Sequence, residues 1–264
     1  MSAPSFAEVL DILHEIAPLE LAAEWDNVGL LLQPHDKPKA VARVLLAIDL
    51  TEAVIDEAAA FKADLVVAYH PPIFRPLARL SMQDATQRRI LRALQAGLPV
   101  YSPHTALDAA PGGLADWLIE GALGDAVPTE VHTCGEGDFG RVAMLDKGIA
   151  WTGLLARLKD MFGVKFLQVA KPAATPRTVR SIAVAAGAGS GVLRGARADV
   201  YVTGEMSHHD VLAATASGAA VVLAGHSNTE RGFLKLLRKH LTGEFGKALD
   251  VRVSKSDRDP LTIV

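Results

Sequence analysis

The chain has 264 residues, half of them apolar, and a formal net charge of −3 at pH 7. This length fits one or two domains of about 100–200 residues each, and the apolar fraction is enough for a substantial core. The charge is a poor match to a nucleic-acid backbone, which normally binds a basic face, so nucleic acid is not an expected partner.

Neither a disulfide nor a membrane anchor is expected. Cys134 is the only cysteine, so no internal disulfide can form, and we expect a reducing, cytoplasmic compartment. The first ten residues lack the basic and apolar regions of a secretory signal. No apolar run reaches the roughly 18–20 residues of a spanning helix, so no membrane partner is expected.

Helical and strand patterns alternate along the first half. Apolar residues recur at spacings of three and four over 4–16, where Ser5 is the expected N-cap, and Thr51 is the expected cap of the next helix. The patterns predict strands over 44–49, over 64–68 and around Val100, and helices over 51–62, 83–96 and 114–123.

The alternation is interrupted and then resumes. The middle of the chain predicts a turn at 136–140, a helix over 153–161 and a strand over 165–169. The rest predicts strands over 181–185, 199–203 and 221–224 and helices over 208–216 and 230–241. Short apolar strands separated by helices indicate an α/β fold with largely parallel sheets.

The two halves resemble each other. The sequence Ala63-Asp-Leu-Val-Val matches Ala198-Asp-Val-Tyr-Val, and each is followed by a polar loop that contains histidine. We therefore predict an internal duplication into two similar α/β domains. The first covers residues 1–125, with a discontinuous arrangement left open, and the second covers 126–264, including a divergent middle segment.

Five of the nine histidines lie at the ends of predicted strands, where open α/β sheets bind ligands. The sharpest signal is a repeat: His104 and His226 are each followed four residues later by a carboxylate, Asp108 and Glu230. On a helix this spacing places both side chains on one face. Imidazole and carboxylate together are ligands for divalent metals. A helix cap with an ordinary ion pair is the alternative for each pair taken alone.

The other clustered residues have less specific signals. His70 precedes two prolines that hold an extended turn, and with the other clusters present we favour it as a metal ligand. His208 and His209 are candidates for further ligands, outer-shell partners or substrate contacts. With Glu205, they are also the candidate catalytic groups for proton transfer. The adjacent histidines point about 100° apart on a helix, so they are not expected to serve one ion.

Two further segments allow more than one interpretation. The glycine cluster at 187–191 could hold an anion or form a tight strand–helix turn, and because it lacks the Walker and dinucleotide spacings we favour the turn. The segment Trp25-Asp-Asn27 could line a pocket or seal one end of the first domain.

Five motifs in this order carry a family resemblance: Trp25-Asp-Asn-Val-Gly-Leu-Leu, Tyr69-His-Pro-Pro-Ile-Phe, His104-Thr-Ala-Leu-Asp, Thr203-Gly-Glu-Met-Ser-His-His-Asp and Gly225-His-Ser-Asn-Thr-Glu. Together they closely resemble the Ngg-interacting-factor-three-like family. Its bacterial members include YbgI-type dinuclear metal-centre proteins, also known as GTP cyclohydrolase 1 type 2 homologues. The resemblance covers nearly the whole chain, which looks like a short form without the large central insertion of some members.

The resemblance implies a two-metal site in the cleft between two similar domains, and a toroidal homohexamer arranged as a trimer of dimers. Carried over by motif, the metal ligands fall on Tyr69, His70, Asp108, His226 and Glu230. Tyr69 stands where bacterial members have a histidine, and a neutral phenol with a reference pKa of about 10 is a weak ligand. We therefore expect one or two divalent ions per subunit, with His104 as a substitute ligand.

Two functions are compatible with these features. The first is a metal-dependent hydrolase acting on a nucleotide-like or cyclic C–N small molecule, as the resemblance implies. The second is a non-catalytic metal-containing scaffold, interaction protein or metal chaperone. Metal binding is the stronger prediction, and zinc, iron, manganese and cobalt all suit mixed imidazole and carboxylate ligands.

Overall fold

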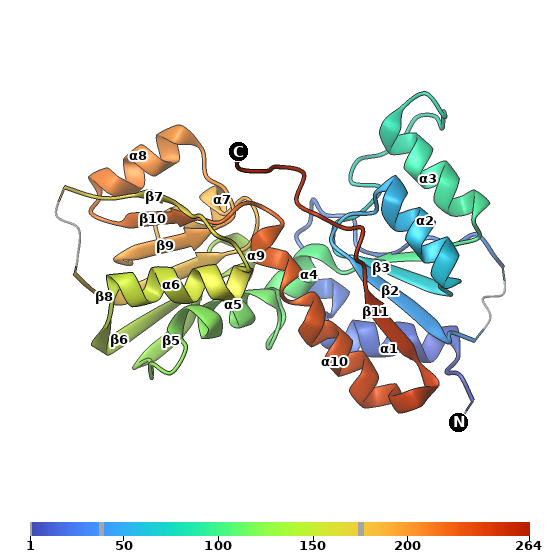
Figure 1. Ribbon diagram of the computed structural model, residues 1–264, viewed down its shortest axis with the longest axis horizontal. Coiled ribbons are helices and arrows are strands. Elements are labelled where there is room, and N and C mark those ends of the chain that lie inside the picture. Colours follow the sequence, from blue (N-terminus) through green and yellow to red (C-terminus); the bar gives the residue numbers. More distant parts are fainter. Residues whose placement is uncertain (1, 37–39, 174–176) are drawn as a thin grey trace. The chain divides into compact units, whose positions relative to one another are not determined.

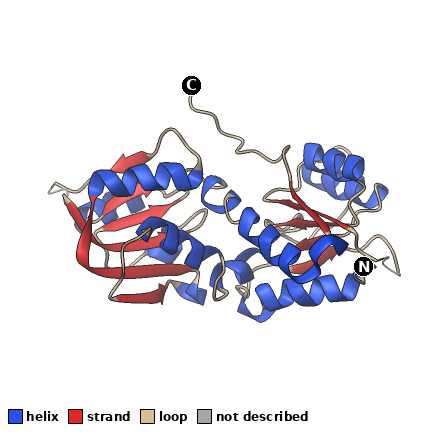
Figure 2. Ribbon diagram, turned by 60° about the horizontal axis from the view of Figure 1, so that its bottom comes forward, coloured by secondary structure: helices blue, strands red, loops and turns tan. Residues whose placement is uncertain are grey.

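The computed structural model describes residues 2–36, 40–173 and 177–264. The chain divides into two compact units: unit 1 is Met1–Leu107 with Phe233–Arg258, and unit 2 is Asp108–Gly232 with Asp259–Val264. Each unit contains one mixed β-sheet covered by helices, so the predicted α/β class is confirmed (Figure 2). Unit 1 is discontinuous in sequence, because a C-terminal strand pairs with its sheet and the helix before that strand belongs to the same unit.

The sheet of unit 1 has the strand order β1-β4-β3-β2-β11. Its strands are β1 (Gly29–Leu32), β2 (Arg43–Ala47), β3 (Leu65–Ala68), β4 (Val100–Ser102) and β11 (Asp250–Val253). The central strands are parallel, and β1 runs antiparallel to β4 at one edge. The parallel strands are almost wholly buried, as expected for a sheet covered on both faces.

Helices cover both faces of this sheet. Helices α2 and α3 lie on one side, and α1 and α10 lie on the other (Figure 1). Ser5 and Thr51 cap α1 and α2 as predicted, since each hydroxyl accepts a bond from a backbone N–H of the first turn. The helical segments are α1 (Phe6–Ile16), η1 (Leu19–Leu21), α2 (Glu52–Phe61), α3 (Ala85–Gln95), α10 (Leu234–Phe245) and η3 (Gly246–Ala248); α4 (His104–Ala109) begins in unit 1 and ends in unit 2.

The sheet of unit 2 has the strand order β5-β6-β8-β9-β10-β7. Strands β8, β9 and β10 are parallel, whereas β5, β6 and β7 join through antiparallel pairs. The strands are β5 (Glu130–Cys134), β6 (Gly140–Ala150), β7 (Gln168–Ala170), β8 (Thr178–Ala185), β9 (Val200–Thr203) and β10 (Ala220–Leu223).

Two apolar clusters sandwich this second sheet. One joins its strands to α5 (Leu114–Leu123) and α6 (Trp151–Phe162). The other joins the opposite face to α7 (Ser190–Leu193) and α8 (His208–Ala216). The remaining helical segments of this unit are α9 (Asn228–Arg231) and η2 (Glu136–Asp138).

The two sheets share a three-strand frame, β2-β3-β4 in unit 1 and β8-β9-β10 in unit 2. In each, an edge strand that precedes the frame in sequence pairs antiparallel with its third strand. Each frame contains an aspartate at the equivalent place. Asp64 Oδ2 accepts hydrogen bonds from the backbone N–H groups of Ala42 and Arg43, and Asp199 Oδ2 accepts them from Arg180 and Ser181. The two sheets thus have in common three parallel strands, an antiparallel edge strand and an aspartate at equivalent places.

Several elements differ from the sequence prediction. Strands β1, β5, β6 and β11 lie outside the predicted elements. Strands β5, β6 and β11 contain exposed or charged residues, and the apolar run of β1 is only four residues long. The predicted helix over 230–241 is two helices, α9 and α10, and the predicted strand over 165–169 begins only at Gln168. Among the described residues, no helix has the length and apolar character needed to cross a membrane.

Candidate metal centre

In unit 1, a carboxylate and an imidazole meet at the ends of two neighbouring strands. Asp49 follows β2 and His70 follows β3, and because these strands are parallel their carboxyl ends lie at the same edge. Asp49 Oδ1 lies 3.0 Å from His70 Nδ1. The ring of His70 is held on its Nδ1 side, which directs Nε2 away from Asp49.

His104 begins α4, directly after β4, with an unusual positive φ of 31°. Its Nδ1 lies 2.8 Å from both carboxylate oxygens of Asp26, whose side chain is fully buried. The backbone N–H of Thr105 also donates to Asp26, at 3.1 Å. Burial raises the pKa of Asp26, but the hydrogen bonds from His104 and Thr105 and the attraction of His104 outweigh it, so the pKa lies below its usual value.

Tyr69 lies in an aromatic cluster with these two histidines. Its ring centroid is 5.0 Å from that of His70 and 5.4 Å from that of His104, and its side chain is buried. The rings of His70 and His104 are 5.5 Å apart. Unit 1 therefore brings together three residues that the sequence proposed as ligands.

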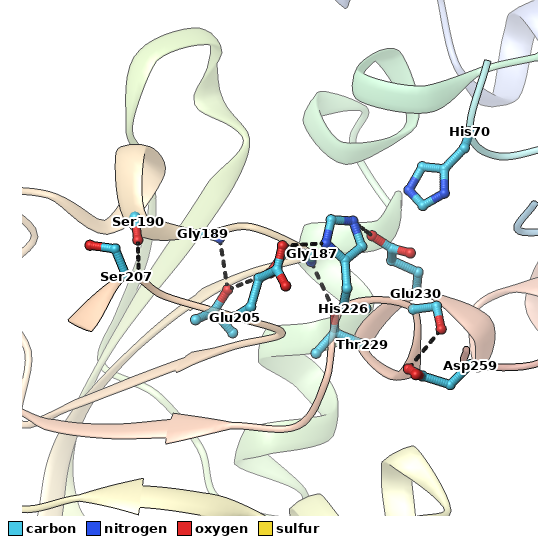
Figure 3. A network of polar contacts seen from close by, with 12 residues as sticks. His70, Gly187, Gly189, Ser190, Glu205, Ser207, His226, Thr229, Glu230 and Asp259 are labelled. Atoms are coloured by element: carbon cyan, nitrogen blue, oxygen red, sulfur yellow. Dashed lines mark hydrogen bonds and ion pairs between the residues drawn. The ribbon is translucent and has the colours of Figure 1, made fainter. Parts of the chain in front are cut away.

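Unit 2 places one histidine between two carboxylates. His226 follows β10, and its Nδ1 lies 3.0 Å from Glu205 Oε1, at the end of the neighbouring strand β9. Its Nε2 lies 3.2 Å from Oε1 of Glu230 on α9, whose side chain is only 2% exposed. Figure 3 shows the imidazole between the two acidic side chains.

The backbone at Gly187 packs directly against this cluster. A Cβ at this position would lie 2.7 Å from Glu230 Oε1 and 2.8 Å from His226 Nε2, and its φ of 53° also disfavours a side chain. Gly187 N–H donates to Thr229 Oγ1 at 2.9 Å (Figure 3). The glycine cluster therefore forms the tight turn after β8 that we favoured, and it gives the imidazole and carboxylate the room they occupy.

The remaining predicted residues lie outside these contacts. His208 and His209 occupy the first turn of α8, exposed, with ring centroids 5.4 Å apart. Within the described ranges, neither forms a hydrogen bond or ion pair with His226, Glu205 or Glu230. Asp108 lies in α4, as the helical spacing predicted.

The donor sets fit a divalent ion. A carboxylate on Nδ1 fixes the tautomer in which Nε2 carries the lone pair, the usual outer-shell arrangement of metal-binding histidines. Two donors bonded to one ion at about 2.0–2.2 Å lie roughly 2.8–3.6 Å apart, and the 3.2 Å between His226 Nε2 and Glu230 Oε1 falls in that interval. A cation would also balance the two carboxylates that contact one imidazole.

The comparison with known families decides the relationship. Residues 4–260 match the profile of the family described as Duf34/NIF3 (NGG1p interacting factor 3), which is nearly the whole chain. The chain belongs to the Duf34/NIF3 family. The resemblance carried by the five sequence motifs is thereby confirmed.

Relatives in this Duf34/NIF3 family extend over the full chain. "Protein NIF3 homolog" of Schizosaccharomyces pombe is 42% identical, covering 95% of both chains. "NIF3-like protein 1" of Homo sapiens is 32% identical and covers 97% of this chain and 92% of its own length. That alignment runs over 349 positions, more than the chain has residues, in keeping with the predicted short form.

Solved structures of Duf34/NIF3 relatives have the same fold. A Bacillus cereus protein related to NIF3 superposes with a TM-score of 0.81 at 21% identity, covering 100% of both chains. Reduced HcgD from Methanocaldococcus jannaschii gives a TM-score of 0.80 at 26% identity, covering 97% of this chain and 98% of its own.

Three positions beside these histidines in this Duf34/NIF3 chain have no assigned role in the sequence prediction. Asp49 ends a predicted strand, and a carboxylate at a parallel strand end is a signal for a site. The sequence does not decide the role of Asp26, because its partner, His104, is remote in sequence. Gly187 could be recognised only once the side chains beside it were located.

Proposed function

We propose that this Duf34/NIF3 protein binds a divalent metal ion through His70, Asp108, His226 and Glu230. The observation that carries the proposal is His226, which has a carboxylate on each ring nitrogen, at 3.0 and 3.2 Å. Imidazole and carboxylate side chains such as those of His70, His226 and Glu230 are the ligand types that divalent ions prefer.

A second ion would depend on the aromatic cluster of unit 1. His104 has its Nδ1 oriented by Asp26, as a ligand histidine requires. Tyr69 would have to ionise to be a strong ligand. We propose that one ion binds tightly and that a second binds through His104 with lower affinity.

We also propose that the metal serves hydrolysis of a nucleotide-like or cyclic C–N compound. When bound, a zinc, iron, manganese or cobalt ion supplies Lewis-acid polarisation of a carbonyl or phosphoryl oxygen. In this scheme Glu205 holds the imidazole of His226 in its ligand tautomer, and the exposed His208 and His209 are the groups that can exchange protons with solvent.

The metal proposal is tested by the metal content of the purified protein after dialysis against trace-metal-free buffer, measured by inductively coupled plasma mass spectrometry. We expect the wild type to retain an ion and His226→Ala to lose it. His132→Ala is the matched control, because His132 is also paired with a glutamate in unit 2 but is exposed on β5. Loss of metal in both variants, or in neither, contradicts the ligand assignment.

Turnover separates the hydrolase from a non-catalytic scaffold. We expect metal-loaded wild type to convert GTP or a related purine, and Glu230→Gln to be inactive. Native mass spectrometry with and without chelator also tests the proposed homohexamer. Absence of turnover, combined with loss of the oligomer on chelation, would favour the scaffold instead.

A further inference from the structure

A second binding feature lies beside His70 in unit 1. A cavity of about 340 Å³ is bounded by Asp49 and His70, by the loop that follows them and by the first turn of α3. Two prolines, Pro71 and Pro72, begin that loop and restrict its backbone. The cavity therefore has one wall at a proposed metal ligand and another on a helix.

The loop presents apolar side chains to solvent. Phe74 and Leu77 line the cavity and are 46% and 37% exposed. Trp25, which is 62% exposed, contacts the edge of Phe74 with ring centroids 5.9 Å apart. Exposed aromatic groups clustered at a cavity are typical of sites for planar organic ligands.

Two arginines also line the cavity. They are Arg75, from the same loop, and Arg89 of α3, and within the described part of the chain neither forms an ion pair. Arg89 Nη2 donates a hydrogen bond to the hydroxyl of Thr86, at 3.2 Å. By contrast, Arg88 and Arg92 on the same helix are neutralised by acidic residues of α2.

Among the described residues that line the cavity, the two arginines outnumber the carboxylates. Asp49 is the one carboxylate in that set, and it contacts His70 Nδ1. Two guanidinium groups without a carboxylate match the multiple acceptor oxygens of a phosphate or carboxylate group.

We propose that this cavity binds a planar organic anion, whose phosphate or carboxylate contacts Arg75 and Arg89 and whose ring packs against Phe74. This rests on the proposed function, because such a ligand would lie beside a residue of the metal centre, His70. It adds a substrate class and two specificity-determining residues to that site.

The proposal is tested by isothermal titration calorimetry with phenyl phosphate as the probe, on metal-loaded and on chelator-treated protein. We expect binding in both forms and at least about 10-fold weaker binding in Arg89→Ala and Arg75→Ala. Arg88→Ala, which removes a paired arginine from the same helix, should bind like the wild type. Thermal unfolding of each variant checks that the fold is retained.

Further probes separate the contributions of ring and anion. Benzoate in place of phenyl phosphate distinguishes carboxylate from phosphate preference, and orthophosphate, which lacks the ring, should bind more weakly. Absence of phenyl phosphate binding by the wild type, or equal binding by an Arg75→Ala/Arg89→Ala double variant, overturns the proposal. Metal content is measured on the same samples, so failure of the metal proposal is recognised separately.

Discussion

Units 1 and 2 have the same three-strand frame but surround their strand-end histidines differently. In unit 2, His226 contacts carboxylates on both ring nitrogens. In unit 1, His104 contacts Asp26 through Nδ1 and otherwise lies among aromatic rings. The repeated spacing of histidine and carboxylate thus marks a strand end, whereas partners from other elements determine what each imidazole can bind.

The difference is electrostatic. Two acidic groups around the imidazole of His226 favour a cation. His104 has one carboxylate beside it, which contacts its Nδ1 and the N–H of Thr105, and the rest of its surroundings are mainly aromatic. We therefore expect substitutions in unit 2 to affect metal binding most and equivalent changes in unit 1 to affect it less.

The largest effect is expected for Glu230→Gln. The substitution keeps the size of the side chain but replaces the carboxylate by an amide, which is a weaker metal ligand, so we expect metal affinity to fall by at least about 100-fold, more than for loss of an outer-shell group. Competition with a chromophoric chelator measures the affinity. Glu136→Gln, an exposed position of the same unit, is the control; an equal loss there would remove the special role of Glu230.

Gly187→Ala tests whether the close approach of the backbone shapes the unit 2 site. The new Cβ would collide with Glu230 Oε1 and His226 Nε2 in a backbone conformation that already disfavours it. We expect a loss of about 1–3 kcal/mol in unfolding free energy, with weaker metal binding, measured by chemical denaturation and chelator competition. Gly191→Ala has open space around its Cβ, and a similar loss in that variant would contradict the explanation.

The pair Glu205→Gln and Asp26→Asn tests the comparison directly. Glu205→Gln should weaken metal binding by about 10–100-fold, because it alters the group that orients His226. Asp26→Asn should instead lower the unfolding free energy by about 1–3 kcal/mol, because it disturbs a buried acceptor of bonds from His104 and Thr105. Both quantities are measured for both variants, and identical profiles would argue that the two histidines have the same role.

Asp64→Ala and Asp199→Ala test the shared frame. Each removes a carboxylate that accepts two backbone N–H groups at the start of a strand. We expect each to cost about 1–2 kcal/mol of unfolding free energy in its own unit, measured by hydrogen exchange at the strand amides. A loss confined to one variant would show that the frames are not equivalent.

The smallest effect is expected for Glu57→Gln in unit 1, where the carboxylate contacts the segment that follows β11. Partial burial raises the pKa of Glu57, but hydrogen bonds from Ser254, Lys255 and Ser256, which follow β11, outweigh it and lower the pKa. The Glu57 carboxylate contributes less than about 1 kcal/mol to the unfolding free energy, because the group is largely solvated. This contribution is present above the unfolded pKa of about 4.3. It is lost as the pH falls through the lowered folded value.

Denaturation midpoints from pH 3 to 7 check this prediction. The wild type should have a higher denaturation midpoint than Glu57→Gln near neutral pH, and the two midpoints should become equal in acid. A difference that persists or grows as the pH falls would contradict the assignment.

The sequence identified elements whose signals are local. The parallel strands β2, β3, β9 and β10 are short, almost wholly buried apolar runs, and helices such as α8, predicted over 208–216, have a capping residue and a turn at their ends. Strand β5 lies outside the prediction for a physical reason: it is largely exposed along its length, so it has no buried apolar run to recognise. The break between α9 and α10 was likewise not marked by proline or by a polar turn.

The sequence by itself determined the α/β class, the family and the histidine and carboxylate side chains at the strand ends, because these depend on short-range patterns and on ordered motifs. Only the tertiary structure decided that β11 completes the first sheet, that Asp49, Asp26 and Glu205 orient three histidines, and that Gly187 packs against His226 and Glu230. These contacts join residues from separate strands and loops. They depend on how parallel strands align their carboxyl ends, which no local pattern records.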